Sequence, residues 1–407
     1  MSTKKFIQEL AENKGTPFYL IETKKAEENF SKIKKSFPKN TIIAYATKAN
    51  YSSSIINLFK NKNTWFDTFT LGEVELLLEN KVKPEKIIYT SVSETTEEFT
   101  YVLSKGVKFF VIGSYNGFCN LKKVAQSKKI EVNVLLRVQP IKRVLAGTTT
   151  SGIKSKFGVV FEKGVDSAKN ILSKFGKFLN FKGFHFHIGT QVMAPEFYIK
   201  AINRTLKFVE KQMINIEFLD IGGGYPFAYN KTIPPVEIFG KKISEVIEDW
   251  RKRLGEFKLI IEPGRALVAN TTTLVTKVVN IKSLYGRKIA IVDASTDMVI
   301  VPRHGKETCV EVISTSKEKE NYVIAGNLCH SRDWIIENPI SLPRVSIGDL
   351  ILFKNLGAYV MNHNIPYGLR KLPKIFVLVK NKIVEEKHPF ELALEMSKNL
   401  SSSLYNF

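Results

Sequence analysis

Short apolar segments alternate with longer helical patterns between about residues 40 and 270. Eight of these segments are predicted to be β-strands, because each is short, apolar and bounded by turn residues. They are 41–47, 64–70, 86–91, 108–114, 131–138, 182–189, 217–224 and 258–265. Strands that alternate with helices form parallel βαβ units, and eight such units predict an α/β fold with a closed (β/α)8 TIM barrel.

The pattern changes after residue 270. Several segments there are rich in β-branched residues and separated by turns, which predicts a mostly antiparallel β domain. These segments are 271–286, 287–295, 321–329, 348–359 and 374–387. The stretch "TPFYLIET" at residues 16–23 is also typical of a strand and could belong to either domain.

The composition limits where the chain works and what it binds. Its net charge of +22 would suit a polyanionic partner, but the lysines are scattered, which favours charges spread over solvated faces. Without a zinc-finger or RNP-type motif, no nucleic-acid partner is expected. No apolar run predicts a membrane span, and the start lacks the apolar core of a signal peptide. Three widely spaced cysteines suit a reducing cytoplasm.

Polar residues stand where the predicted barrel strands end. Active sites of TIM barrels lie at the carboxyl ends of the strands, so these residues are expected to converge. They carry both signs of charge, which a charged cofactor would need. They are Lys48, Asp67, Arg137, His187, Gly222–Gly224, Glu262 and Arg265.

Three glycines follow the strand in "LDIGGGYP", residues 219–226. Glycines let a backbone approach a phosphate closely and offer several N–H donors, although alone they would indicate only a tight turn. The spacing is not that of a dinucleotide-binding or P-loop motif. In the late strands of a barrel, a glycine loop is a recurrent phosphate site.

"GFHFHIGTQ" alternates, so His185 and His187 are predicted to share one face of their strand. Two such histidines could bind a metal, but no third ligand of matching spacing is found, so no metal is expected. An imidazole could instead stack on an aromatic cofactor, or form a hydrogen bond in the core.

"IIEPGR" places Glu262 directly after an apolar strand, where a buried carboxylate needs a cationic or donor partner. A protonated pyridine nitrogen would serve, and Arg265 could hold a phosphate or carboxylate; a Glu–Arg structural pair is the alternative. Lys48 closes the strand of "IAYATKANY" either as a surface charge or as a reactive amine. Together these groups suit pyridoxal 5′-phosphate (PLP), with burial expected to lower the pKa of Lys48.

The ordered motifs resemble those of the fold-type III PLP-dependent decarboxylases. That family includes the diaminopimelate, ornithine and carboxynorspermidine decarboxylases, and the resemblance covers about residues 15–380. It is carried by "YATKAN", "FHFHIGTQ", "LDIGGGYP", "IEPGR", "NLCHSRD" and "GAY". It implies an alanine racemase-like barrel over 26–270, completed by a β-sandwich or barrel domain from 1–25 and 271–407 that includes the N-terminal strand.

The resemblance also implies roles for individual residues. Lys48 would hold the cofactor as a Schiff base, with His187 stacked on the ring and Glu262 at the ring nitrogen. The phosphate or the substrate carboxylate would be surrounded by Thr190, Gly223, Gly224, Arg265 and Tyr359.

By the same resemblance, the protein is expected to be a homodimer with shared active sites. Cys329 would arrive from the partner chain and return a proton to the substrate carbon, and Lys156 would pair across the interface with Asp333. Glu262 would keep the ring protonated. That favours decarboxylation of the α-carboxylate, through a Schiff base and a quinonoid, over racemisation.

The substrate positions depart from the family pattern. His330 stands where relatives have an acidic residue for a distal ammonium, and Val301 and Gly305 stand where diaminopimelate enzymes have an arginine and a tyrosine. A basic cluster of Arg303, His304, His330 and Arg332 would suit a neutral or anionic distal group.

That cluster favours a conjugated amino acid of natural-product, siderophore or amino-acid biosynthesis, such as a γ-glutamyl group on an acidic carrier protein or a citryl-linked diamino acid. Diaminopimelate remains an alternative substrate and racemisation an alternative reaction. A non-catalytic binding protein would lack Lys48 or Cys329, and both are present.

Overall fold

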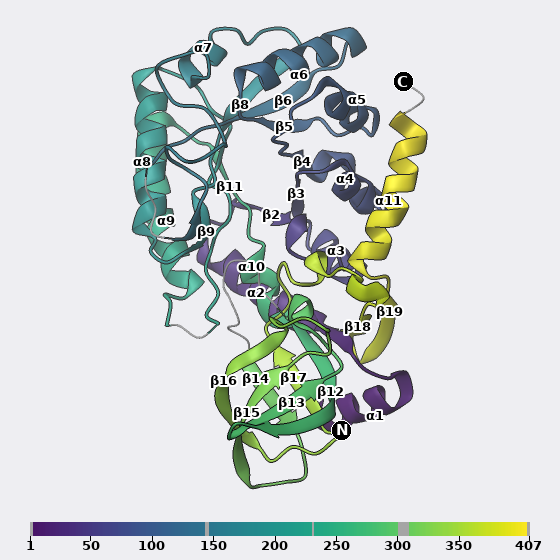
Figure 1. Cartoon of the computed structure of the whole chain (residues 1–407). Coiled ribbons are helices and arrows are strands. Elements are labelled where there is room, and N and C mark those ends of the chain that lie inside the picture. The colour runs from purple at the N-terminus through teal and green to yellow at the C-terminus, as the bar shows by residue number, and fades with distance from the viewer. Residues whose placement is uncertain (1–2, 143–145, 230–231, 300–308, 405–407) are drawn as a thin grey trace.

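The computed structural model describes residues 3–142, 146–229, 232–299 and 309–404, which form a barrel and a separate β domain (Figure 1). Eight strands close the barrel in the order β10-β11-β2-β3-β4-β5-β6-β8, and every neighbouring pair is parallel. The strands are β2 (Ile42–Ala46), β3 (Trp65–Thr68), β4 (Ile87–Tyr89), β5 (Phe109–Ile112), β6 (Val132–Arg137), β8 (Leu179–His185), β10 (Phe218–Asp220) and β11 (Lys258–Ile261). The predicted (β/α)8 barrel is confirmed: seven of the eight predicted segments contain one of its strands, and the segment 182–189 overlaps β8, which begins three residues earlier and ends at His185.

Two buried clusters explain why the strands are apolar on both faces. One face of the strands fills the barrel interior with residues such as Ala44, Ile88 and Leu135. The other face packs against the surrounding helices, as Tyr45 does against Phe59 with ring centroids 4.7 Å apart. A parallel sheet covered by helices is buried on both faces, so its strands read as continuous apolar runs.

Hydroxyl side chains fix where several barrel helices begin. Ser52, Thr70, Thr95 and Ser114 each accept a hydrogen bond from the backbone N–H three residues further on. Such N-caps satisfy donors that a helix start otherwise leaves unpaired. The barrel helices are α2 (Thr23–Ser36), α3 (Ser53–Asn61), α4 (Leu71–Glu79), α5 (Thr96–Ser104), α6 (Tyr115–Lys128), α7 (Ala168–Leu172), α8 (Glu196–Lys211), α9 (Val236–Leu254) and α10 (Arg265–Val268).

The β domain is a nine-stranded sheet that includes the N-terminal strand. Its main path is β16-β15-β13-β12-β1-β18-β19, with β17 pairing β12 and β14. Most pairs are antiparallel, but β1 pairs β18 and β13 pairs β15 in parallel. The strands are β1 (Phe18–Glu22), β12 (Thr272–Leu284), β13 (Arg287–Val292), β14 (Cys309–Ile313), β15 (Lys319–Ala325), β16 (Trp334–Pro343), β17 (Leu350–Lys354), β18 (Lys374–Val379) and β19 (Lys382–Glu386).

Some described elements were not predicted. Helix α1 (Thr3–Lys14) precedes β1, and α11 (Pro389–Leu404) runs beside the barrel next to α4 (Figure 1). The short strands β7 (Ala146–Thr149) and β9 (Gly189–Val192) pair with each other outside the barrel. Strand β8 ends at His185, so the prediction that regular alternation continues to His187 is wrong.

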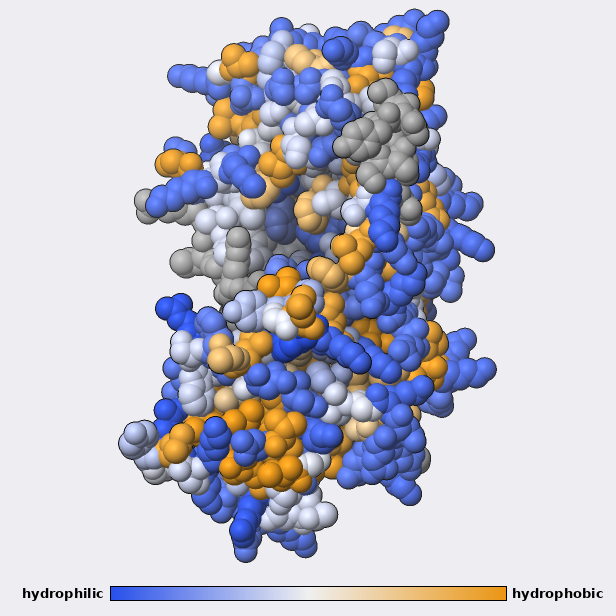
Figure 2. All heavy atoms as spheres, turned by 45° about the vertical axis from the view of Figure 1, so that its right-hand side comes forward, coloured by the Kyte–Doolittle hydropathy of each residue, from blue (hydrophilic) through white to orange (hydrophobic). Residues whose placement is uncertain are grey.

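The described helices include none that is long and apolar enough to cross a membrane. Hydrophilic side chains spread over the whole face shown in Figure 2, with an apolar group on its β-domain part.

Candidate active site

Lys48 lies at the mouth of the barrel, in the 3-10 turn Thr47–Ala49 that follows β2. The Asn362 side chain donates to the backbone oxygen of Lys48 at 2.8 Å, which fixes the turn from the other domain. The Lys48 amine forms an ion pair with the carboxylate of Asp67, the third residue of β3. Lys48 is 36% exposed and Asp67 only 2%. Lys48 is therefore an anchored amine rather than a freely solvated surface charge.

The pKa of Lys48 is raised, so the predicted lowering of that pKa is wrong. Burial does oppose the charge of the amine, but Asp67, Tyr359, Glu262 and Glu73 surround it and together outweigh burial. The ammonium form is therefore favoured at neutral pH. A lysine attacks an aldehyde only as the neutral amine, so Asp67 restrains the reactivity of Lys48 until this ion pair is broken.

Replacing Asp67 with asparagine should move the covalent capture of PLP by Lys48 to lower pH. The raised pKa means that the reactive neutral amine accumulates only as the pH rises, and Asp67→Asn removes the nearest carboxylate that holds it up. Each unit by which the pKa falls raises the neutral fraction about tenfold. The rate of visible-band formation after mixing protein and PLP across a pH series checks this. An unchanged pH profile would contradict the role of Asp67.

The glycine loop after β10 is packed too closely to admit side chains. A Cβ at Gly223 would lie 2.1 Å from the backbone oxygen of Glu262, and one at Gly224 would lie 2.1 Å from that of Gly189. The Gly223 N–H donates to Nδ1 of His187 at 3.1 Å. In this conformation the Gly223 N–H therefore orients His187, while its predicted contact with a phosphate stays a prediction.

Both histidines of the motif belong to the site. The hydrogen bond from Gly223 places the ring proton of neutral His187 on Nε2. Nε2 of His185 lies 3.5 Å from Oε2 of Glu262. Burial and the positive charges of Arg137 and Lys48 lower the pKa of His187 well below its usual value, and burial and Arg137 do the same for His185. The neutral form of both imidazoles is therefore favoured.

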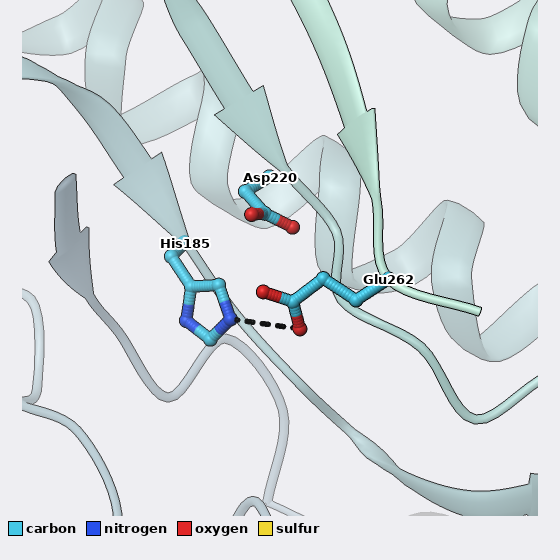
Figure 3. A group of neighbouring side chains, drawn as sticks. All are labelled: His185, Asp220 and Glu262. Atoms are coloured by element: carbon cyan, nitrogen blue, oxygen red, sulfur yellow. Dashed lines mark hydrogen bonds and ion pairs between the residues drawn. The ribbon is translucent and has the colours of Figure 1, made fainter. Parts of the chain in front are cut away.

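Glu262, Asp220 and His185 form a buried group at the ends of β11, β10 and β8 (Figure 3). One ligand atom from each lies within 4.8 Å of the others, an arrangement that could hold a metal ion. However, Arg137 already acts electrostatically on both carboxylates, and Lys48 acts on that of Glu262. Glu262 Oε1 is buried and accepts no hydrogen bond from the described residues, so it is available to a donor on a bound molecule.

Arg265 opens helix α10 and is 6% exposed. Its Nη1 donates to the Tyr229 hydroxyl at 2.7 Å, and its guanidinium lies 4.9 Å from the centre of the Tyr359 ring. The Tyr359 N–H donates to the backbone oxygen of Ala49, beside Lys48. Buried Nε of Arg265 has no acceptor among the described residues. An anion at this position would satisfy it.

The structure of this chain does not test the roles of the remaining predicted residues. Cys329, His330 and Arg332 are exposed on the loop between β15 and β16. Asp333 is 5% exposed and accepts hydrogen bonds from Thr296 and Leu328, so any interchain pair with Lys156 would share these oxygens. Lys156 is exposed, Thr190 lies in β9, and Arg303 and His304 fall outside the described residues. The predicted roles of these residues stay predictions.

The family model described as "Pyridoxal-dependent decarboxylase, pyridoxal binding domain" matches residues 23–269 of this chain. This chain belongs to that family. The match spans the barrel with Lys48, the glycine loop and Glu262, so the protein is a PLP-dependent decarboxylase with the predicted fold. The free acceptor of Glu262, the crowded glycine loop and the anchored amine of Lys48 all fit the cofactor.

Curated relatives match almost the whole chain. Diaminopimelate decarboxylase of Helicobacter pylori is 27% identical over 94% of this chain and 96% of its own length. The enzyme of the same name from Methanothermobacter thermautotrophicus is 28% identical over 94% and 91%.

Solved structures of relatives share the fold. Diaminopimelate decarboxylase from H. pylori complexed with L-lysine has a TM-score of 0.84 at 26% identity, covering 97% of this chain and 100% of that one. The M. jannaschii enzyme in complex with L-lysine has a TM-score of 0.85 at 26% identity, covering 93% and 91%.

Two buried acids of the site were not singled out from the sequence. Asp220 is the last residue of β10, two residues before the first glycine of "LDIGGGYP", and that position was its only signal. Glu73 lies in the first turn of α4, accepts from the Phe69 N–H and the Tyr51 hydroxyl, and is 3% exposed. Burial raises the pKa of Glu73 to about 7. Its spacing from Thr70 is that of an ordinary helix cap, which hides its nearness to Lys48.

Proposed function

We propose that this enzyme removes the α-carboxylate of an amino acid whose far end carries a hydrogen-bond acceptor. His330 carries this proposal. Its Nδ1 accepts from the Arg332 N–H at 3.2 Å, so the other ring nitrogen of the neutral side chain bears a proton and donates. A donor beside Arg332 suits a carbonyl or carboxylate and does not suit an ammonium group.

The barrel residues would divide the chemistry as follows. When bound, PLP supplies a protonated ring that withdraws electrons from the carbon that loses CO2. The Lys48 amine would bond to the cofactor aldehyde carbon, Glu262 would accept the ring N–H, and the His187 ring would lie against the cofactor ring. The phosphate or the substrate carboxylate would be held by Arg265 and the nearby Thr190, Gly223, Gly224 and Tyr359.

A homodimer would complete the site. The loop that carries Cys329, His330 and Arg332 is exposed, which supports its approach to the barrel mouth of a second copy. Cys329 would then return a proton to the substrate carbon after CO2 leaves. The three cysteines are free and exposed, which supports a reducing cytoplasm as the location.

Conjugated amino acids meet the requirement for a distal acceptor. In a γ-glutamyl or citryl conjugate of a diamino acid, an amide carbonyl or a carboxylate takes the place of the distal ammonium. Such compounds occur in natural-product and siderophore assembly, and an acidic carrier protein that presents one would be attracted by the net charge of +22.

Diaminopimelate is the second candidate substrate, because the relatives named above carry that activity in their names over more than nine-tenths of this chain. Racemisation is the third candidate and is the least favoured. A carboxylate such as Glu262 at the ring nitrogen keeps the ring a strong electron sink, which suits the loss of CO2.

A substrate panel with a charge-reversal variant tests the distal contact. We expect CO2 release from γ-glutamyl and citryl conjugates to exceed that from meso-diaminopimelate. His330→Glu should lower kcat/KM for the conjugates by about 10- to 100-fold, because a donor is replaced by an acceptor, and should raise it for meso-diaminopimelate. His330→Gln, which keeps a donor, is the matched control. Wild-type preference for meso-diaminopimelate would overturn the proposed substrate class.

A further inference from the structure

Asp220 and Glu262 form a carboxyl pair that the roles above do not explain. Both side chains are buried, with Asp220 0% and Glu262 6% exposed. They project from the ends of the adjacent strands β10 and β11, and in Figure 3 their carboxyl groups point toward each other. Two ionised carboxylates this close and this buried would repel strongly.

Each carboxyl group of the pair has one oxygen without a hydrogen-bond donor. Asp220 Oδ1 accepts from the Gly222 N–H at 2.8 Å, whereas Oδ2 has no donor among the described residues. Glu262 Oε2 faces His185, whereas Oε1 has no donor among them. Ionised carboxylates only accept hydrogen bonds. A single proton shared between the two groups would satisfy both orphaned oxygens.

The surrounding charges do not support two anions here. Lys48 forms its ion pair with Asp67 and acts on Glu262 without contacting it as an ion pair, His185 is neutral, and Asp67 itself adds negative charge. Arg137 is the other cation that acts on the pair, and it faces Asp67 and Glu94 as well. Burial, with smaller contributions from Tyr198 and the two acids, raises the pKa of the Tyr225 hydroxyl well above its usual value, so it stays neutral. One proton per pair is therefore the stable state.

The nearby cations decide which acid keeps the proton, because burial raises the pKa of both. Burial and the nearby Glu262 raise the pKa of Asp220 well above its usual value. Burial also raises the pKa of Glu262, but Lys48, Arg137 and the contact with Asp220 oppose that rise. The cations therefore favour the ionised form of Glu262 over that of Asp220.

We propose that Asp220 stays neutral and is a positioning residue whose Oδ2–H donates to Glu262, holding that carboxylate ionised and aimed at the cofactor's ring nitrogen. A carboxylate oxygen has two acceptor sites, so Glu262 can accept from Asp220 and from the ring N–H together. Oδ1 of Asp220 meanwhile ties the pair to Gly222 of the glycine loop. This inference rests on the role proposed above for Glu262.

Two variants separate a neutral donor from an anion. Asp220→Asn keeps the shape, the acceptor for Gly222 and a donor toward Glu262, whereas Asp220→Ala removes both. We measure the Kd of PLP for each protein after removal of the cofactor. Asp220→Asn should bind within about threefold of wild type, and Asp220→Ala should bind about 10- to 100-fold more weakly. If Asp220→Asn loses as much affinity as Asp220→Ala, Asp220 acts as an anion and the inference is overturned.

A cofactor analogue shows whether the loss acts through the ring nitrogen. In 1-deazapyridoxal 5′-phosphate a carbon replaces that nitrogen, so Glu262 has nothing to bind. The loss of affinity in Asp220→Ala should shrink to within about threefold of wild type with this analogue. An equal loss with both compounds would mean that Asp220 only supports the local fold, which also overturns the inference.

Infrared spectroscopy tests the shared proton without any cofactor. The difference spectrum between wild type and Asp220→Asn at neutral pH should show the carbonyl band of one neutral carboxyl group in the wild type. Its absence would contradict the inference, whatever the enzyme decarboxylates. A wild-type protein that shows this band but fails to bind PLP would instead contradict the proposed function.

Discussion

Replacing Lys48 with alanine is expected to lower the rate of CO2 release by about 10³-fold or more. The variant loses the only amine held at the barrel mouth next to Asp67 among the described residues, and with it both a covalent anchor and a group that moves protons. The same variant should lose the visible absorbance band of the bound cofactor. Activity and absorbance measured on one preparation check both expectations.

Lys105 provides the matched control for Lys48. It forms an ion pair with Glu75 and is 32% exposed, similar to Lys48 at 36%, but it follows α5 rather than a barrel strand. Lys105→Ala should keep the band and lose less than about threefold in rate, as expected for a partly exposed pair. Full activity in Lys48→Ala, or equal losses in the two variants, would contradict the role of Lys48 as the covalent anchor of the cofactor.

Glu262→Gln should reduce kcat by about 10²- to 10³-fold while PLP still attaches to Lys48. Glutamine keeps the size of the side chain but cannot stabilise a protonated ring nitrogen. The negative charge that develops on the α-carbon as CO2 leaves is therefore less well stabilised. Stopped-flow absorbance and single-turnover CO2 release separate attachment from chemistry. A variant that keeps kcat within about threefold of wild type would show that Glu262 does not act on the ring.

Glu73→Gln is the control for removal of a buried acid near Lys48. Glu73 is buried like Glu262, but its carboxylate accepts from the Phe69 N–H and the Tyr51 hydroxyl rather than offering a free oxygen. We expect its loss to change the pH profile of PLP attachment more than kcat, because Glu73 contributes to the raised pKa of Lys48. If Glu73→Gln lowered kcat as much as Glu262→Gln, the loss of any buried negative charge near Lys48 would explain both results, and no specific contact between Glu262 and the cofactor ring would be needed.

The barrel could be predicted from the sequence because its signals are local. Each parallel strand is buried on both faces and reads as an apolar run, and polar residues mark where it ends. Residues as far apart as Lys48, Asp67 and Glu262 therefore converge by topology alone. The resemblance of the motifs to a known family then supported PLP as the cofactor and implied a role for each residue.

Other elements could not be predicted because their stability comes from tertiary context. Strand β16 contains Pro339, which argues against a strand, but β16 is an edge strand and tolerates it. Strand β1 lies between β12 and β18, far away in sequence, so its domain was ambiguous. The charge balance at Lys48 depends on which acids surround the amine, and that depends on the fold rather than on the segment around it.

Decarboxylation itself is tested most directly with a γ-glutamyl conjugate of a diamino acid labelled with ¹³C in the α-carboxylate, in deuterated water. We predict that ¹³CO2 is released in an amount equal to the amine formed, that the amine gains one deuterium at the carbon that lost CO2, and that unreacted substrate gains none. Deuterium at the α-carbon of recovered substrate without ¹³CO2 would contradict decarboxylation and identify a racemase. Release of ¹³CO2 from labelled meso-diaminopimelate but not from the conjugate would support decarboxylation and contradict the proposed class of substrate.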